Sequence, residues 1–198
     1  MKTVFPSSLP CSPEDTYEQP YSYDVEKAKE YLEQYKAEAG VDTVDITILA
    51  PDTAMYLYPA NTVEGMLREV GFNVTVEQID RATYWSSVYA GEYQLAVTGT
   101  SWPVRDCDGN YLYFYSTAGQ NYFMIDNADI DKYLDLGRST SDENERRDAY
   151  THVQEVIDEE AICVPLLQPA IAVAYSADLK GVNTEDDIYC HYVYDWSW

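Results

Sequence analysis

The sequence lacks long apolar runs and has few cationic residues. No stretch approaches the roughly 20 apolar residues that a membrane-spanning helix requires. Only 12 Lys and Arg stand against 35 Asp and Glu, so the formal net charge is −23. The electrostatic field of so negative a protein repels a polyanion, which argues strongly against a nucleic-acid partner. We interpret the charge as a source of solubility rather than a means of recruiting a cationic ligand.

Motifs for metals, cofactors and catalysis are also missing. There are only two histidines, without partners at metal-ligand spacing, and no serine-hydrolase, zinc-protease or phosphate-binding glycine motif. The segment DCDGN begins like a calcium loop, but Thr117 stands where the bidentate glutamate belongs. We therefore expect no cofactor, no metal and no enzymatic activity. A hydrolase with a glycosidase-like carboxylate pair stays as an alternative, because acidic residues are abundant.

The four cysteines have no CxxC spacing, which is unlike a zinc site. They are Cys11, Cys107, Cys163 and Cys190, and they allow three complete disulfide pairings. If any pair forms, Cys107 with Cys190 is favoured, since both lie in tyrosine-rich loops, whereas Cys163 in ICVPLL is expected to pack as a small apolar side chain. Lipidation of Cys11 is rejected because no apolar segment precedes it.

What the chain does contain is an alternation of helix and strand signals, typical of an α/β layer with crossover connections. Asp24, Asp80 and Asn127 each precede an expected helix, and Gly40, Gly71 and Gly91 stand where helices should stop. Thr140 or Ser141 is expected to cap a long helix. The strands are expected near 44–48, 72–79, 95–98, 161–167 and 171–175, with an irregular aromatic stretch at 101–124.

One sheet and one core are predicted from this pattern. The helices that contain Leu32, Leu67 and Val153 should pack on that sheet. Its predicted members are Val44, Ile46, Val74, Val76, Leu95, Val97, Val164 and Leu166.

Extended segments of the chain resemble a known family in order and spacing. They are YDVEKAKEYLEQYKAEAG (23–40), LREVGFNVTVEQIDRATYW (67–85), GEYQLAVTGTSW (91–102), NYFMIDNADIDKYLDLGRS (121–139), ERRDAYTHVQEVIDEEAICVPLLQP (145–169) and DLKGV (178–182). Together they resemble the C-terminal lobe of the family 5 extracellular solute-binding proteins, the peptide, oligopeptide and nickel receptors of ABC importers. Val25 departs from the family pattern, which has proline there.

The resemblance implies a single lobe of a type II periplasmic-binding-protein-like fold over residues 1–198, with helices on a central mixed sheet. Residues 1–22 would be an irregular lead-in from a hinge, and residues 181–198 a tail toward it. Expected partners are a peptide or other small solute, an N-terminal lobe absent from this sequence, and a membrane permease. The protein would be extracellular, anchored on the cell surface or periplasmic. The start MKTVFPSSLPCSP lacks the apolar centre of a secretory signal.

The expected binding site is the loop that follows the strand ending near Thr100, because ligands of α/β layers lie at the carboxyl ends of strands. The family has a tryptophan here, matched by Trp102, and an aspartate that pairs with the α-ammonium group of a peptide. Asp106 lies one residue beyond the family position, and Asp108 either joins the site or makes turn bonds beside Gly109. Tyr111, Tyr113 and Tyr122 complete the predicted ligand-binding set.

Two alternatives stay open for function. An oligosaccharide or metal-chelate receptor of the same family would stack Trp102 and tyrosines on its ligand without a carboxylate anchor. A purely structural interaction module would show no concave face around Trp102.

Overall fold

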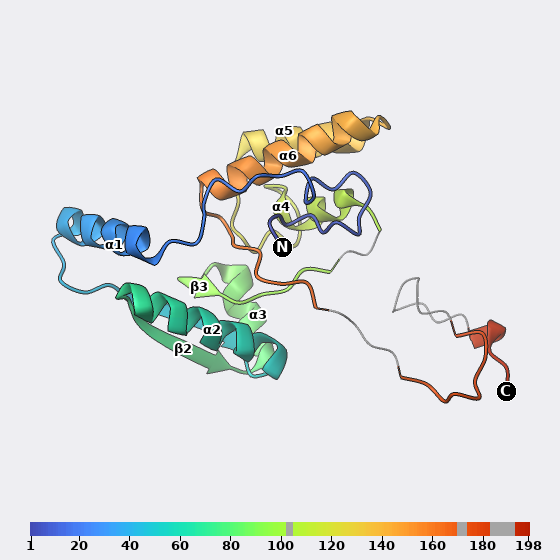
Figure 1. Cartoon of the computed structure of the whole chain (residues 1–198), viewed down its shortest axis with the longest axis horizontal. Helices are drawn as coiled ribbons and strands as arrows, with labels where there is room; N and C mark the ends of the chain where they lie inside the picture. The colour runs from blue at the N-terminus through green and yellow to red at the C-terminus, as the bar shows by residue number, and fades with distance from the viewer. Residues whose placement is uncertain (102–104, 170–173, 183–192) are drawn as a thin grey trace. The chain divides into compact units, whose positions relative to one another are not determined.

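The computed structural model describes residues 1–101, 105–169, 174–182 and 193–198 (Figure 1). The chain divides into two compact units, 1–166 and 167–198. The first unit contains the sheet and helices α1 to α6. In the second, a bridge joins Lys180 to Ser197, and a short 3-10 helix, η2, spans Val193–Asp195. The expectation that 1–198 forms one lobe stays a prediction.

Three parallel strands form the sheet, in the order β2-β1-β3. Strand β1 (Asp45–Pro51) pairs with β2 (Asn73–Ile79) along its whole length and with β3 (Leu95–Ala96) over two residues. Helix α2 (Ala54–Val70) connects β1 to β2, and α3 (Arg81–Ala90) connects β2 to β3. The predicted α/β architecture with crossover helices is confirmed.

The second half of strand β1, residues 48–51, is buried on both faces, and two apolar clusters form there. Ile48 and Ala50 join Ala60 of α2 and Val74 of β2 in the smaller cluster. Leu49 belongs to the larger one. Because successive side chains of a strand point to opposite faces, the clusters lie on opposite sides of β1. The prediction of a single core is therefore wrong.

The helix ends follow the local signals in most cases. Asp24 accepts a hydrogen bond from Lys27 N at the start of α1 (Val25–Ala39), and Asp80 and Asn127 cap α3 and α5 (Ala128–Ser139) in the same manner. Gly40, Gly71 and Gly91 adopt positive φ at the C-caps, which glycine does without strain. The cap of α6 (Glu143–Glu159) is Asp142 rather than Thr140 or Ser141. Thr140 instead donates its hydroxyl to Glu145.

Two parts of the predicted sheet are wrong. Residues 162–169 form no strand, and Val164 and Leu166 are 75% and 45% exposed. An alternating apolar pattern needs a partner edge, and none of the described strands supplies one to this segment. Val153 lies on α6, which packs on α5 rather than on the sheet. The strand expected at 171–175 lies partly outside the described residues.

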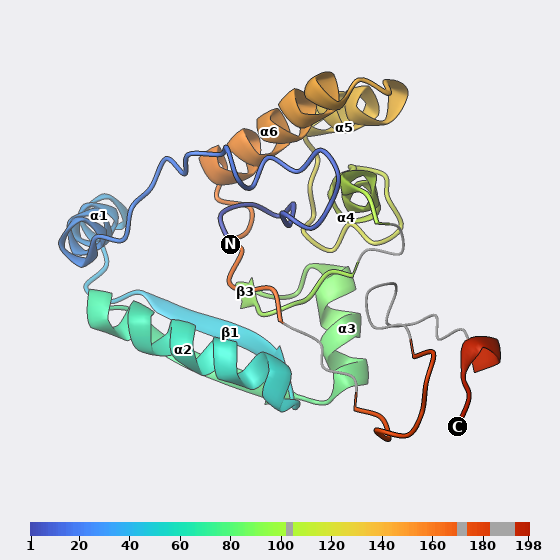
Figure 2. The same ribbon diagram turned by 45° about the vertical axis from the view of Figure 1, so that its right-hand side comes forward.

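The larger cluster joins the N-terminal segment to α5 and α6, which lie side by side in both views (Figures 1 and 2). Phe5 is fully buried against Tyr150 of α6, with ring centroids 5.1 Å apart. Val4 N donates to Gln154 Oε1 at 2.8 Å, and Tyr17 donates its hydroxyl to Asp158 at 2.6 Å. The irregular lead-in is thus an integral part of the packed unit. The aromatic stretch at 101–124 also contains a 3-10 helix, η1 (Cys107–Asn110), and a short helix, α4 (Tyr111–Phe114).

Candidate ligand-binding site

The candidate site follows the carboxyl end of β3, where the chain continues as Val97–Ser101. Val97 N donates to Leu49 O of β1 at 3.0 Å. Among the described residues, this is the last hydrogen bond between the segment and β1, and the chain leaves the sheet after it. Trp102 lies outside the described residues, together with 103 and 104. Its ligand role therefore stays a prediction. The described chain resumes at Arg105 and leads into η1.

Three tyrosine hydroxyls bind the backbone of the segment before Trp102. Tyr84 donates to Val97 O at 2.8 Å, Tyr122 to Gly99 O at 3.4 Å, and Tyr113 to Ser101 O at 2.6 Å. The Tyr113 oxygen also accepts from Ser101 N at 3.3 Å. Tyr113 and Tyr122 were predicted to touch ligand, and the structure brings both to this segment. Their side chains are buried, at 5% and 2% exposure, so neither ring faces solvent.

Asp106 caps η1 and is paired with an arginine. It accepts a hydrogen bond from Asp108 N at 2.8 Å and a two-pronged contact from the guanidinium of Arg146, with Nη1 at 3.1 Å and Nη2 closer. Burial pushes the pKa of Asp106 up, but the bonds from Arg146 and Asp108 N outweigh it, so the pKa lies below its ordinary value. The predicted ammonium anchor is therefore an ionised carboxylate that already has a cation beside it.

Asp108 has a different arginine partner. Arg138 of α5 donates to both of its carboxylate oxygens, at 2.8 and 3.0 Å, and lies 3.6 Å over the ring of Tyr111. Tyr111 in turn stacks on Tyr115, with centroids 4.1 Å apart. The structure thus separates the predicted set into two groups. Asp108 and Tyr111 form a cluster with Arg138, whereas Tyr113 and Tyr122 support the segment before Trp102.

Sequence reasoning missed Tyr84, Arg138 and Arg146. A signal for Arg146 was available: it lies three and seven residues before Ala149 and Val153, on the inward stripe of the long helix. A cation on such a stripe needs a buried partner. Tyr84 carries no comparable mark, because tyrosine is common throughout this chain. Arg138 lies in the last turn of its helix, where a cation is expected without any partner.

Three of the four cysteines lie in the described residues as free thiols. They are Cys11, Cys107 and Cys163, and Cys107 is fully buried. Burial raises the pKa of Cys107 to about 12. Cys190, its predicted partner, lies outside the described residues.

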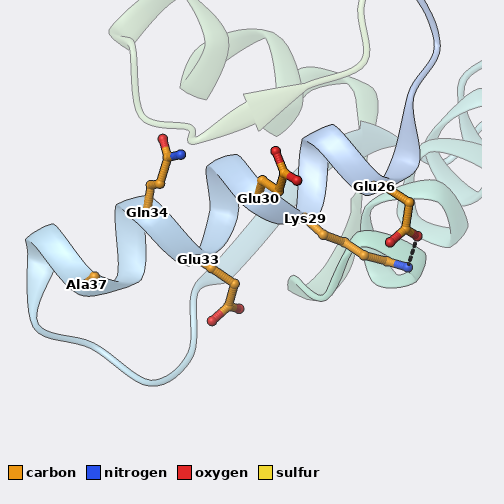
Figure 3. Close-up of a pocket in the computed structure, with 6 residues that line it drawn as sticks. All are labelled: Glu26, Lys29, Glu30, Glu33, Gln34 and Ala37. Atoms are coloured by element: carbon orange, nitrogen blue, oxygen red, sulfur yellow. Dashed lines mark hydrogen bonds and ion pairs between the residues drawn. The ribbon is translucent and has the colours of Figure 1, made fainter.

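A shallow depression also runs along one face of α1, lined by Glu26, Lys29, Glu30, Glu33, Gln34 and Ala37 (Figure 3). All six residues come from this one helix, and Lys29 is paired with Glu26 at 2.8 Å. We assign no ligand to this solvent-facing surface. Within the described ranges, no group of three or more acidic, histidine or cysteine side chains could hold a metal ion. No helix there is long and apolar enough to cross a membrane.

Comparison with known proteins agrees with these features. Residues 1–122 match the model of the bacterial extracellular solute-binding proteins, family 5 middle. The dipeptide-binding protein of Escherichia coli is 25% identical over 173 residues, which are 84% of this chain and 31% of that protein. The probable D,D-dipeptide-binding periplasmic protein DdpA of Escherichia coli is 25% identical over 174 residues, 81% of this chain and 33% of its own. The chain thus spans about a third of the length of these relatives.

Solved structures share the fold. The periplasmic binding protein DppA of Helicobacter pylori, solved with the peptide STSA, superposes with a TM-score of 0.70 at 25% identity, covering 82% of this chain and 32% of that one. OppA of Burkholderia pseudomallei gives a TM-score of 0.74 at 16% identity over 91% of this chain and 37% of that one. These matches confirm a type II periplasmic-binding-protein fold. Since the family model covers more than half of its residues, the chain belongs to the family 5 bacterial extracellular solute-binding proteins.

Proposed function

We propose that this chain forms one wall of a cleft that closes on a peptide, in the substrate-binding component of an ABC importer. The observation that carries the proposal is the match to receptors named for dipeptides, combined with a backbone segment held at the carboxyl end of β3. The curated relatives are about three times longer than this chain, which leaves room in them for an opposite wall.

Closure in such a receptor would be a hinge motion between two lobes. A ligand favours the closed state because it touches both walls there and only one wall in the open state. Trp102 and Asp106 are our proposed direct contacts. Asp108 and Tyr111 would take part only if the ligand reaches the Arg138 cluster, and Tyr113 and Tyr122 would act through the segment that they bind.

The wider biological setting belongs to the same proposal. The relatives are named as binding proteins, and we propose that this chain likewise has no catalytic role. Both carboxylates near the site have an arginine partner, unlike the facing pair of a glycosidase. We further propose an extracellular or periplasmic location, with a membrane permease as partner. A lipid anchor on the complete protein would be in keeping with the family resemblance.

Mass spectrometry of small molecules that co-purify with the complete gene product tests the proposed ligand class. Peptides in the extract, displaced by an added dipeptide or oligopeptide, would support the proposal. Recovery of an oligosaccharide or a metal chelate instead would contradict it and favour the other receptor type.

The anchor role of Asp106 can be tested by Asp106→Asn in the complete protein. Binding of peptides with a free amino terminus should weaken by about 1.5–3 kcal/mol, the scale of a hydrogen bond to a charged group. Amino-acetylated peptides should lose much less, as measured by calorimetry. Because Asp106 also pairs with Arg146, a purely structural role predicts equal losses for both peptide types. Glu92→Gln, at an exposed carboxylate, is the matched control.

A further inference from the structure

The hydroxyls of Tyr84, Tyr122 and Tyr113 donate to backbone oxygens along one edge of the segment 97–101. Their acceptors are the carbonyl oxygens of Val97, Gly99 and Ser101, every second residue. In an extended chain, alternate residues direct their main-chain groups to the same side. Beyond the point at which β3 parts from β1, three tyrosine side chains therefore supply the hydrogen bonds that a neighbouring strand would supply in a sheet.

The three rings are fixed with respect to one another through Trp85. Tyr84 meets Trp85 edge-on at 5.2 Å, Trp85 contacts Tyr122 at 5.7 Å, and Tyr122 contacts Tyr113 at 5.6 Å. Tyr84 and Tyr122 come from α3 and from the stretch after α4, and both are almost fully buried. A hydroxyl on a ring packed in this way has little freedom to leave its acceptor.

The hydroxyls of Tyr84 and Tyr122 also stay donors over a wide range of pH. Burial raises the pKa of Tyr84 to about 12 and raises the pKa of Tyr122 as well. Both groups are therefore protonated at neutral and mildly alkaline pH. The other edge of the segment is different: in the described structure, the main-chain groups of Thr98 and Thr100 have no hydrogen-bond partner.

We infer that Tyr84, Tyr113 and Tyr122 are positioning residues that hold residues 97–101 extended and thereby set the affinity of the binding site. This inference rests on the proposed function for its ligand. The tyrosines do not touch the ligand. Their hydroxyls order the backbone before the ligand arrives, so the binding free energy is not reduced by the cost of ordering this segment.

The test is Tyr113→Phe, Tyr84→Phe and Tyr122→Phe in the complete gene product, with amide hydrogen exchange of residues 97–101 and peptide affinity as readouts. Tyr113→Phe should speed exchange of the Ser101 amide by about 2- to 12-fold, the range for one net hydrogen bond. Peptide affinity should fall by a comparable factor. The effects should decrease from Tyr113 to Tyr84 to Tyr122, in the order of their bond lengths.

Tyr17→Phe is the matched control, because Tyr17 is also buried and its hydroxyl binds Asp158 far along the chain. It should lower the midpoint of unfolding without changing exchange at 97–101 or peptide affinity. Equal exchange in Tyr17→Phe and Tyr113→Phe would overturn the inference, as would faster exchange in Tyr113→Phe with unchanged affinity. If the wild-type protein binds no peptide, the proposed function fails, while the exchange comparison still decides whether the hydroxyls hold the segment.

Discussion

Arg146 connects four parts of the first unit through one guanidinium. It donates to Gly137 O of α5 at 2.9 Å, to the carboxylate of Asp106, and to Tyr150 Oη at 3.1 Å, and it contacts Cys11 Sγ at 3.7 Å. Its side chain is only 16% exposed, so these bonds replace most of its hydration. The bonded carboxylate raises the pKa of Arg146 further, which keeps the pair charged at every physiological pH.

The Arg146 pair predicts a dependence of stability on acid. Because Arg146 and Asp108 N bind the carboxylate of Asp106, its pKa is lower in the folded protein than the ordinary value of this group. Such a group stabilises the fold fully above its unfolded pKa, and this contribution is lost as pH falls through the folded pKa. Asp106→Asn should therefore cost about 1.5–3 kcal/mol of unfolding free energy at pH 7, the scale of a bond to a charged group, and less at pH 3, where the contribution has begun to be lost.

Urea unfolding at the two pH values provides the measurement, with Glu92→Gln as the exposed control. Glu14 also has a lowered pKa, so some acid dependence should persist in the Asp106 variant. An equal difference between wild type and Asp106→Asn at both pH values would show that the charge of Asp106 does not stabilise the fold.

At the scale of elements, α5 and α6 approach each other closely because Gly137 has no side chain. A Cβ placed there would lie 2.7 Å from Cε1 of the Tyr150 ring. That ring is fully buried and receives a bond from Arg146, which prevents it from moving aside. Gly137 thus allows the close spacing of α5 and α6 at this contact.

Gly137→Ala should destabilise the protein although alanine favours helices. Overpacking a buried contact costs about 1–3 kcal/mol, which exceeds the gain of about 1 kcal/mol from helix propensity. Gly65→Ala in α2 is the matched control, because its Cβ would meet nothing within 4 Å. Urea denaturation should show opposite signs for the two variants. Stabilisation by both would mean that Tyr150 yields at little cost.

Element ends were predictable because their signals are local. Asp24, Asp80 and Asn127 bind the first free N–H groups of their own helices, and no distant residue takes part. The apolar segment at 162–169 failed as a strand because pairing depends on an available edge elsewhere. Contacts around the candidate site show the same division: the pairing of Asp106 with Arg146, and the bond from Tyr84 to Val97 O, depend on tertiary packing.

At the scale of the whole molecule, the first unit contains every described strand of the sheet and both apolar clusters. We predict that residues 1–166 fold without residues 167–198. Circular dichroism of the truncated chain should retain the helical signal, and urea should unfold it in one cooperative transition. A gradual, non-cooperative transition would show that the remaining 32 residues are required for the fold.

The tyrosine hydroxyls described above bind carbonyl oxygens, and every amino acid supplies a carbonyl oxygen. A substitution at Thr100 would therefore leave all three acceptors in place, whereas the hydroxyl of Thr98 is buried and any replacement there must fit its surroundings. Variation at Thr100 removes none of the three supporting hydrogen bonds. The support of the segment is therefore separable from the chemistry of the side chain at position 100.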